Sequence, residues 1–198
     1  MKVIEIRNNE LVSISEDKTM KIWALNLKSF KCKNTIKISE NDYSDFNILK
    51  LNENELVISS SEDEFLKFYN SNNYTNISIL NNINVKSSLD SMALLNDDVF
   101  CVYGSKGFYL IKISTHQMIK NIIKDQEIKS MFQCFDKTIL CSISTENLNH
   151  SFIKYKYENE DLIQVFEKNS GNDYYSIFET ENGNIIVVGY ECILKLFS

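Results

Sequence analysis

Short apolar runs alternate with polar turns along the whole chain. The clearest example is Leu11 to Trp23 (LVSISEDKTMKIW), in which two apolar segments flank a polar stretch. Within it, Lys21-Ile22-Trp23 alternates with a period of two residues, which is typical of a β-strand and not of a helix. The pattern therefore predicts two strands joined by a tight polar turn.

This hairpin pattern recurs along the sequence. In the second copy, Leu56 to Tyr69 (LVISSSEDEFLKFY), Ser61 and Tyr69 each lie 46 positions after the matching residue, Ser15 or Trp23. A spacing of about 40 to 46 residues is typical of repeated four-stranded units. The remaining copies are Val99 to Ile113, Ile139 to Ser144 with Ser151 to Tyr157, and Ile185 to Phe197.

Each hairpin has a further apolar segment before it, such as Met131 to Phe135, and most have another β-like run after it, such as Tyr74 to Leu80. Each repeat is therefore predicted to contain four strands, which we call A, B, C and D in chain order. The predicted organisation is a single domain, 1–198, with repeat boundaries at 1–43, 44–87, 88–126, 127–172 and 173–198, the last repeat lacking its outer strand.

The first copy resembles a WD repeat, and the second is a weaker match. The resemblance implies an all-β fold, a WD-like β-propeller of about five four-stranded blades, with an incomplete or open ring as an alternative to a closed one. WD propellers commonly have seven blades. The chain is therefore expected to be part of a longer propeller, the product of an incomplete gene model, or a chain completed by a partner.

The resemblance also implies structural roles for residues of the polar turn. A hydroxyl and a carboxylate beside a tight corner can accept backbone N–H groups that no strand satisfies. In WD repeats the matching aspartate supports a buried network with the tryptophan of strand C. The implied structural residues are Ser15, Asp17 and Trp23, with Ser61, Asp63 and Tyr69 as a second copy.

Composition narrows the classes of partner. The formal net charge of −6 argues against nonspecific binding to nucleic acid or to an anionic membrane, since both repel an acidic surface. The five cysteines form no C-x-x-C pair, and most fall in predicted apolar strands, so free thiols in a reducing compartment are expected. No apolar run is long enough for a signal peptide or a membrane span, which predicts a cytoplasmic protein.

Candidate catalytic and metal-binding residues are few. His116 and His150 fall in or near polar connecting segments, and Cys134 and Cys141 have no histidine nearby in the sequence. The glycine-containing stretch Gly104 to Gly107 joins two strands instead of opening a helix, unlike a phosphate-binding loop. We therefore predict no catalytic residue, metal or cofactor, and no small-molecule ligand.

Topology predicts one interaction surface. In a blade of four antiparallel strands, the B–C turn and the D–A connection lie at the same end. In the first two repeats this end gathers an acidic rim, which would steer a basic peptide or protein segment, with a tyrosine as an anchor. Its residues are Glu16, Asp17, Glu40, Asp42, Tyr43, Glu62, Asp63 and Glu64.

The sequence thus favours a noncatalytic scaffold that binds a protein or peptide on the loop-bearing face. A solubilising role for the acidic loops stays open. So do two further alternatives, a structural fragment of a larger multidomain WD-repeat protein and a propeller hydrolase or lyase with an active site in the central channel. The enzyme would need carboxylates or histidines on the innermost strands, which carry mainly apolar residues such as Ile4, Ile6 and Ile48.

Overall fold

The protein is seen here in a computed structural model, which is built from β-strands. In the part of the chain that it describes, every paired strand is antiparallel to its neighbour and no helix occurs. The described residues are 1–26, 29–40, 45–60, 64–81, 83, 92–104, 107–122, 127–144, 150–169, 174–180, 182, 184–189 and 194–197.

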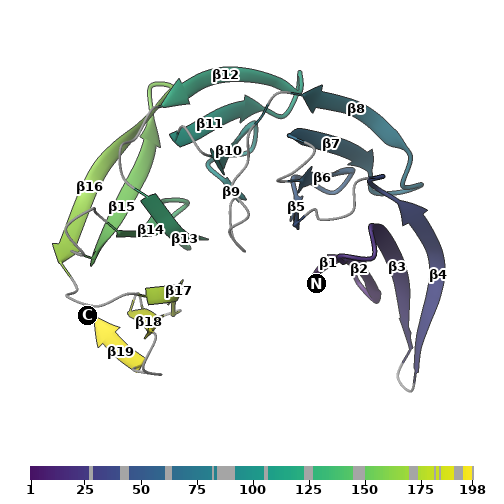
Figure 1. The fold of residues 1–198 in the computed structure, drawn as a ribbon, viewed down its shortest axis with the longest axis horizontal. Coiled ribbons are helices and arrows are strands. Elements are labelled where there is room, and N and C mark those ends of the chain that lie inside the picture. Colours follow the sequence, from purple (N-terminus) through teal and green to yellow (C-terminus); the bar gives the residue numbers. More distant parts are fainter. Residues whose placement is uncertain are drawn as a thin grey trace. The chain divides into compact units, whose positions relative to one another are not determined.

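The chain divides into two compact units, and the first is Met1–Ser87. It contains two four-stranded sheets whose strands are hydrogen-bonded in chain order, sheet A and sheet B (Figure 1). Sheet A consists of β1 (Lys2–Arg7), β2 (Glu10–Ile14), β3 (Thr19–Asn26) and β4 (Ser29–Lys37). Sheet B consists of β5 (Phe46–Lys50), β6 (Glu55–Ser60), β7 (Phe65–Asn70) and β8 (Asn76–Asn81).

The second unit is Ser88–Ser198, and it contains sheets C, D and E. Sheet C consists of β9 (Met92–Leu94), β10 (Val99–Gly104), β11 (Gly107–Lys112) and β12 (Gln117–Ile122). Sheet D consists of β13 (Glu127–Gln133), β14 (Ile139–Ser144), β15 (His150–Glu158) and β16 (Asp161–Asn169). Sheet E has three strands among the described residues, β17 (Tyr174–Glu179), β18 (Ile185–Gly189) and β19 (Leu194–Phe197).

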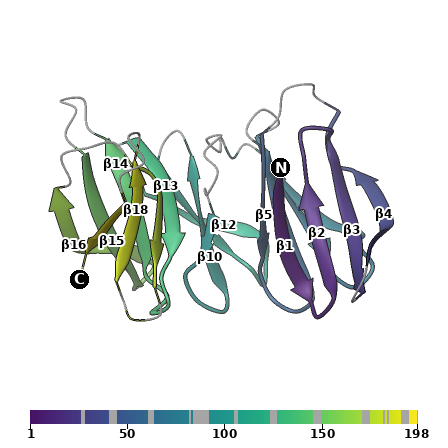
Figure 2. The same cartoon turned by 90° about the horizontal axis from the view of Figure 1, so that it is seen from below.

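Each sheet buries apolar side chains against its neighbour within the unit. Figure 2 shows the strands of sheet A side by side, with β1 next to β5 of sheet B. The core between these two sheets contains Ile14 and Ile22 from sheet A and Ile58 from sheet B, all about 1% exposed or less. Between sheets C and D, Phe108 contacts the rings of Tyr103 and Tyr155, each at a centroid distance of 5.6 Å. Sheet-on-sheet packing therefore forms the core of each unit.

The fourth strand of each complete sheet carries one extra residue. The pairing between the third and fourth strands slips by one position opposite Trp23, Tyr69, Ile111 and Tyr155. Such a β-bulge twists a strand and interrupts its regular edge, which disfavours unwanted pairing with another chain. The four outer strands therefore share one local irregularity, and the extra residues are Lys33, Ile77, Ile119 and Val165.

The sheets follow the predicted repeats, but some strand boundaries differ. Strand β13 begins at Glu127, where the apolar pattern had placed the start at Met131, because Ile128 pairs with Ile143 although polar residues flank it. Tyr74 was expected to begin a strand, yet it has a φ of 59° and lies in the loop before β8. Alternation predicts a strand only where one face is buried.

We predict that Phe108→Ala lowers the free energy of unfolding of the second unit by about 3 to 5 kcal/mol, because it leaves a cavity between sheets C and D. The matched control is Phe135→Ala, since Phe135 is 69% exposed and Phe108 is 0% exposed. The control should change the free energy by about 0.5 kcal/mol or less. Urea unfolding monitored by circular dichroism measures both, and equal effects would contradict this packing.

Candidate interaction site

The structure describes part of the predicted acidic rim. Glu16, Asp17, Glu40 and Glu64 are described, and all four side chains are exposed. The predicted turn residues Ser15, Trp23 and Tyr69 are also described. The other predicted residues, Asp42, Tyr43, Ser61, Glu62 and Asp63, lie outside the described residues.

The β2–β3 turn is held by its own side chains. The backbone N–H of Lys18 donates to the carbonyl of Ser15 at 3.0 Å, and that of Asp17 donates to Ser15 Oγ at 3.3 Å. Asp17 Oδ1 accepts from the backbone N–H of Thr19 at 3.1 Å and from its hydroxyl at 2.6 Å. Lys18 has a φ of 64°, a conformation that the bonds on either side of it hold in place. The hydroxyl and carboxylate thus accept N–H groups, as their positions beside the corner predicted.

A second corner of the same kind lies in sheet D. There Asp136 Oδ1 accepts from the backbone N–H of Thr138 at 3.1 Å and from its hydroxyl, and Lys137 has a φ of 61°. This Asp-Lys-Thr corner joins the first and second strands of its sheet, whereas Asp17-Lys18-Thr19 joins the second and third. The triplet is therefore a device for closing hairpins, used at either end of a sheet.

Asp17 and Trp23 do not share the buried network that the family resemblance implied. Asp17 is exposed, and its second oxygen accepts from Lys21 Nζ at 2.6 Å. Trp23 is half-buried, and its Nε1–H donates to Ser13 Oγ at 2.9 Å. The two residues therefore support the hairpin separately, because the aspartate satisfies the turn while the indole bonds across to β2.

The B–C turn and the segment after the fourth strand meet at the same end in both sheets of the first unit. In sheet A the N–H of Ile38 donates to the carbonyl of Lys18 at 2.9 Å, and Lys18 Nζ lies 3.4 Å from the carbonyl oxygen of Glu40. In sheet B the N–H of Ile83 donates to the carbonyl of Glu64 at 3.1 Å. The described members of the rim are thus brought to one end of the unit.

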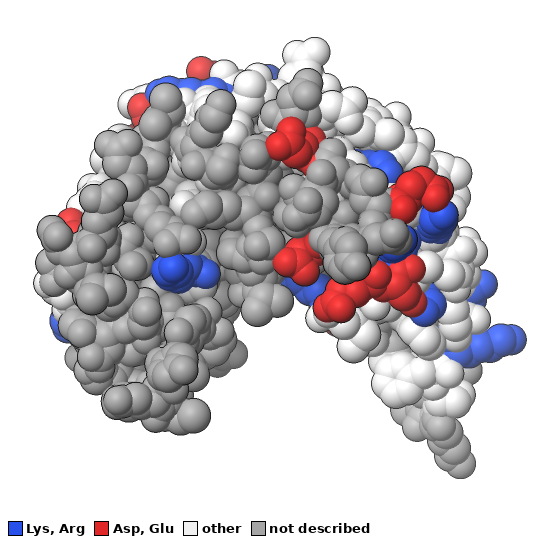
Figure 3. Space-filling model, in the orientation of Figure 1, with Lys and Arg blue, Asp and Glu red and all other residues white. Residues whose placement is uncertain are grey.

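Lysines are interspersed with the carboxylates at this end. Lys21 pairs with Asp17, and Lys37 pairs with Glu40. Hydrogen bonds from Lys21 and Thr19 lower the pKa of Asp17 to about 2. Figure 3 shows acidic and basic side chains lying next to one another over the first unit. The described part of the rim therefore carries charges of both signs.

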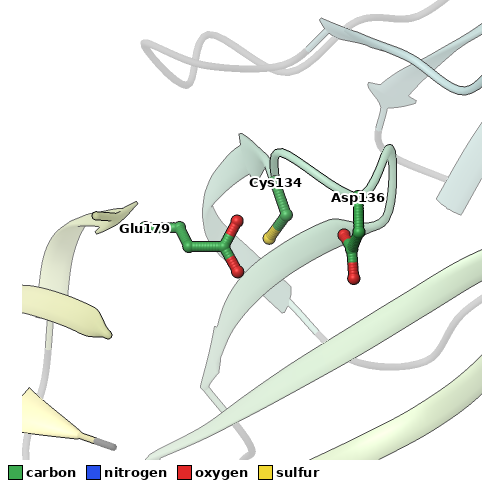
Figure 4. A group of neighbouring side chains, drawn as sticks. All are labelled: Cys134, Asp136 and Glu179. Atoms are coloured by element: carbon green, nitrogen blue, oxygen red, sulfur yellow. The ribbon is translucent and has the colours of Figure 1, made fainter. Parts of the chain in front are cut away.

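A group of potential metal ligands in the second unit was not predicted from the sequence. Cys134 Sγ and carboxylate oxygens of Asp136 and Glu179 lie within 4.8 Å of one another (Figure 4). Cys134 and Asp136 lie in the β13–β14 turn, and Glu179 ends β17 of the next sheet. Little in the sequence points to this group, because Glu179 is far from the other two residues along the chain.

The surroundings of this group favour a junction between sheets over a metal site. Lys154 Nζ lies 3.0 Å from Asp136 Oδ2 and 3.5 Å from Glu179 Oε1, so it already compensates both carboxylates. The N–H of Phe135 donates to the other oxygen of Glu179 at 2.8 Å. Burial raises the pKa of the Cys134 thiol to about 11, which opposes the thiolate that a metal requires. These contacts join sheet E to the turn of sheet D.

We predict that Lys154→Met lowers the free energy of unfolding by about 1 to 3 kcal/mol, because it removes the cation beside the largely buried Glu179 carboxylate and the exposed Asp136 carboxylate. Lys156→Met is the matched control on the same strand. Lys156 is 56% exposed, against 20% for Lys154, and pairs only peripherally, with Glu158 at 3.4 Å. Urea unfolding measures the free energy of unfolding of both variants. If Lys156→Met destabilises the protein as much as Lys154→Met does, the junction does not have this stabilising role.

The lowered pKa of Asp17 predicts a pH dependence. Because the folded-state pKa is about 2 and the ordinary value is 3.8, ionised Asp17 stabilises the fold above pH 4, and this contribution disappears as the pH falls through 2. Asp17→Asn keeps the acceptor for Thr19 but loses the charge. At pH 6 it should be less stable than the parent by about 0.5 to 1 kcal/mol, the range of an exposed ion pair. The gap in urea unfolding should close toward pH 2, and a gap independent of pH would contradict the assignment.

Comparison with known proteins places the fold. No protein-family model matches this chain. No curated protein matches it in sequence either. In the described part of the chain, no helix has the length and apolar character needed to cross a membrane.

One solved structure is similar over nearly the whole chain. A chain in the crystal structure of the mitotic checkpoint complex aligns with the present protein with a TM-score of 0.72 at 10% sequence identity. That matched chain is a WD40 propeller. The alignment covers 96% of the present protein and 60% of the other chain, so the present protein spans less than two thirds of the length of its match. The protein therefore has the all-β fold of a WD40-like β-propeller, with its sheets as blades.

Proposed function

We propose that this protein is a noncatalytic scaffold that binds a partner protein or peptide at one end of sheets A and B. This end, which we call the turn end, carries the β2–β3 turn and Glu64 before β7. The fold supports this proposal, since the similar WD40 propeller was solved as part of a protein complex. Fold alone does not name a partner, because one architecture serves many functions. The argument therefore depends on the residues of the turn end.

The observation that carries the proposal is the presentation of exposed carboxylates on backbone that hydrogen bonds hold in place. Glu16 lies in the β2–β3 turn, which side-chain and backbone hydrogen bonds fix in place. Glu64 lies just before β7, and its carbonyl is bound by the N–H of Ile83. Backbone held in this way loses little further conformational entropy when a partner binds. The turn end is therefore suited to recognition.

The chemistry of the rim favours a basic partner segment. Asp42, Tyr43, Glu62 and Asp63 belong to the same proposal on sequence grounds, and they would add three carboxylates and an aromatic anchor. The interspersed lysines would set the register of a bound segment by repelling misplaced positive charges. A cytoplasmic location, without nucleic-acid or membrane binding, belongs to this proposal as well.

The bonding of Asp17 favours binding over catalysis at the rim. A glycoside hydrolase needs two carboxyl groups that face each other across a bound sugar. One oxygen of Asp17 accepts from Thr19 and the other accepts from Lys21, so both carboxylate oxygens already have hydrogen-bond partners in the hairpin. This bonding supports a binding role for the rim.

We predict that the full chain binds a fluorescein-labelled oligolysine peptide in low salt, with a Kd on the order of micromolar, and that the affinity falls as salt is added. Replacing both Glu16 and Glu64 by lysine should weaken binding by about tenfold or more, because it reverses two charges of the rim. Fluorescence anisotropy measures the binding.

The control reverses a charge at the opposite end of sheet B. Glu53→Lys changes an 82% exposed carboxylate between β5 and β6, and it should alter the Kd by about twofold or less. If Glu53→Lys weakens binding as much per charge as the rim variant does, the peptide senses only the net charge, and the proposed site is wrong.

A further inference from the structure

Lys37 lies beside the β2–β3 turn, at the turn end of sheet A. It ends β4, where the strand register pairs it with Thr19, and the N–H of Ile38 donates to the carbonyl of Lys18 at 2.9 Å. The Nζ of Lys37 donates to the carboxylate of Glu40, three residues further along the chain. The two side chains are 57% and 83% exposed. A lysine of the chain thus already pairs with one of the acidic groups of the rim.

The carboxylate of Glu40 differs from that of Asp17 in what it holds. The two oxygens of Asp17 have partners in the hairpin, Thr19 for one and Lys21 for the other, so Asp17 stabilises the turn. In the part of the chain that the structure describes, the carboxylate of Glu40 accepts from Lys37 and holds no backbone group. Glu40 can therefore exchange its partner without opening the hairpin.

The ion pair of Lys37 with Glu40 matters more for binding than for stability. An exposed pair of this kind contributes little to stability, since water screens both charges. It does affect binding, because a basic partner brings the same chemical group to the same carboxylate. A partner lysine that approaches Glu40 must displace the ammonium group of Lys37 and then remain close to a like charge, which repels it. Lys37 therefore weakens the attraction that the rim exerts on a basic segment.

We propose that Lys37 is an internal competitor of the basic partner, and that its ion pair with Glu40 lowers the affinity of the turn end. This proposal rests on the proposed function, since it requires that the rim binds a basic segment. The partner replaces Lys37 at Glu40 when it binds, and the affinity rises when Lys37 loses its charge. The carboxylates thus determine which chemical group the rim binds, and Lys37 determines how tightly the rim binds it.

The test measures the Kd of the full chain for the fluorescein-labelled oligolysine peptide in low salt, by fluorescence anisotropy. Lys37→Gln should bind the peptide about two- to fivefold more tightly, which is the range expected for one exposed ion pair. Lys37→Arg keeps the charge and the pairing with Glu40, so it should not tighten binding. Each variant is checked for an unchanged circular dichroism spectrum.

The matched control is Lys50→Gln. Lys50 pairs with Glu53 at 2.7 Å with the same spacing of three residues, and this pair lies at the opposite end of sheet B. Removing the charge of Lys50 alters the net charge of the chain as much as Lys37→Gln does, but it should change the Kd by about 1.5-fold or less. If both variants tighten binding equally, the peptide senses only the net charge, and the proposal is wrong.

A double variant identifies the carboxylate that Lys37 occupies. Replacing both Lys37 and Glu40 by glutamine removes the whole ion pair, so the Kd should return to about the parent value. If the double variant keeps the gain, or if Lys37→Gln binds no more tightly than the parent, the role of Lys37 is overturned and the proposed function stands. If neither the parent nor any variant binds the peptide, both are overturned.

Discussion

The packing of one sheet on the next is the constraint on which the rest of this structure depends. Each sheet has three or four short strands with apolar residues on both faces. A single sheet therefore cannot shield its own apolar residues from water and needs a neighbouring sheet. In the first unit, Ile22 and Ile58 from neighbouring sheets meet in one core, and in the second unit Phe108 meets Tyr155 in the same way. Because the strands are committed to packing, recognition is left to the turns.

The hairpin corners are closed without help from proline, of which the chain has none, and with only five glycines. Side chains that accept backbone N–H groups take their place, as Asp17, Asn96 and Asp136 do. Non-glycine residues with positive φ, such as Lys18 and Lys137, follow from these corners. An acidic residue in a turn of this protein is therefore first a structural acceptor. This separates Asp17, whose oxygens the turn uses, from Glu16, whose exposed carboxylate is presented by the same turn.

The fold was predictable from the sequence because alternation and spacing report directly on strands and repeats, as in Leu11 to Trp23 and Leu56 to Tyr69. The place of the described carboxylates, such as Glu16 and Glu64, beside the β2–β3 turn and before β7 follows from antiparallel order, which fixes which turns share an end. The separate partners of Asp17 and Trp23 were not predictable, because the bonds that a side chain makes depend on its burial. Asp17 is exposed and pairs with Lys21, whereas the Trp23 indole donates to Ser13. The junction of Glu179 with Lys154 depends on contact between two sheets, and no spacing along the chain reveals it.

The most direct test of this account is amide hydrogen exchange of the full chain, followed by mass spectrometry of its peptides. Exchange reports the local free energy of opening. Packing between repeated sheets predicts protection that rises and falls once per repeat, strongest in second and third strands such as β6 and β7 and weakest in outer strands such as β4 and β16, whose side chains are mostly exposed. Protection that is uniform along the chain, or strongest in the outer strands, would contradict sheet-on-sheet packing as the basis of this fold.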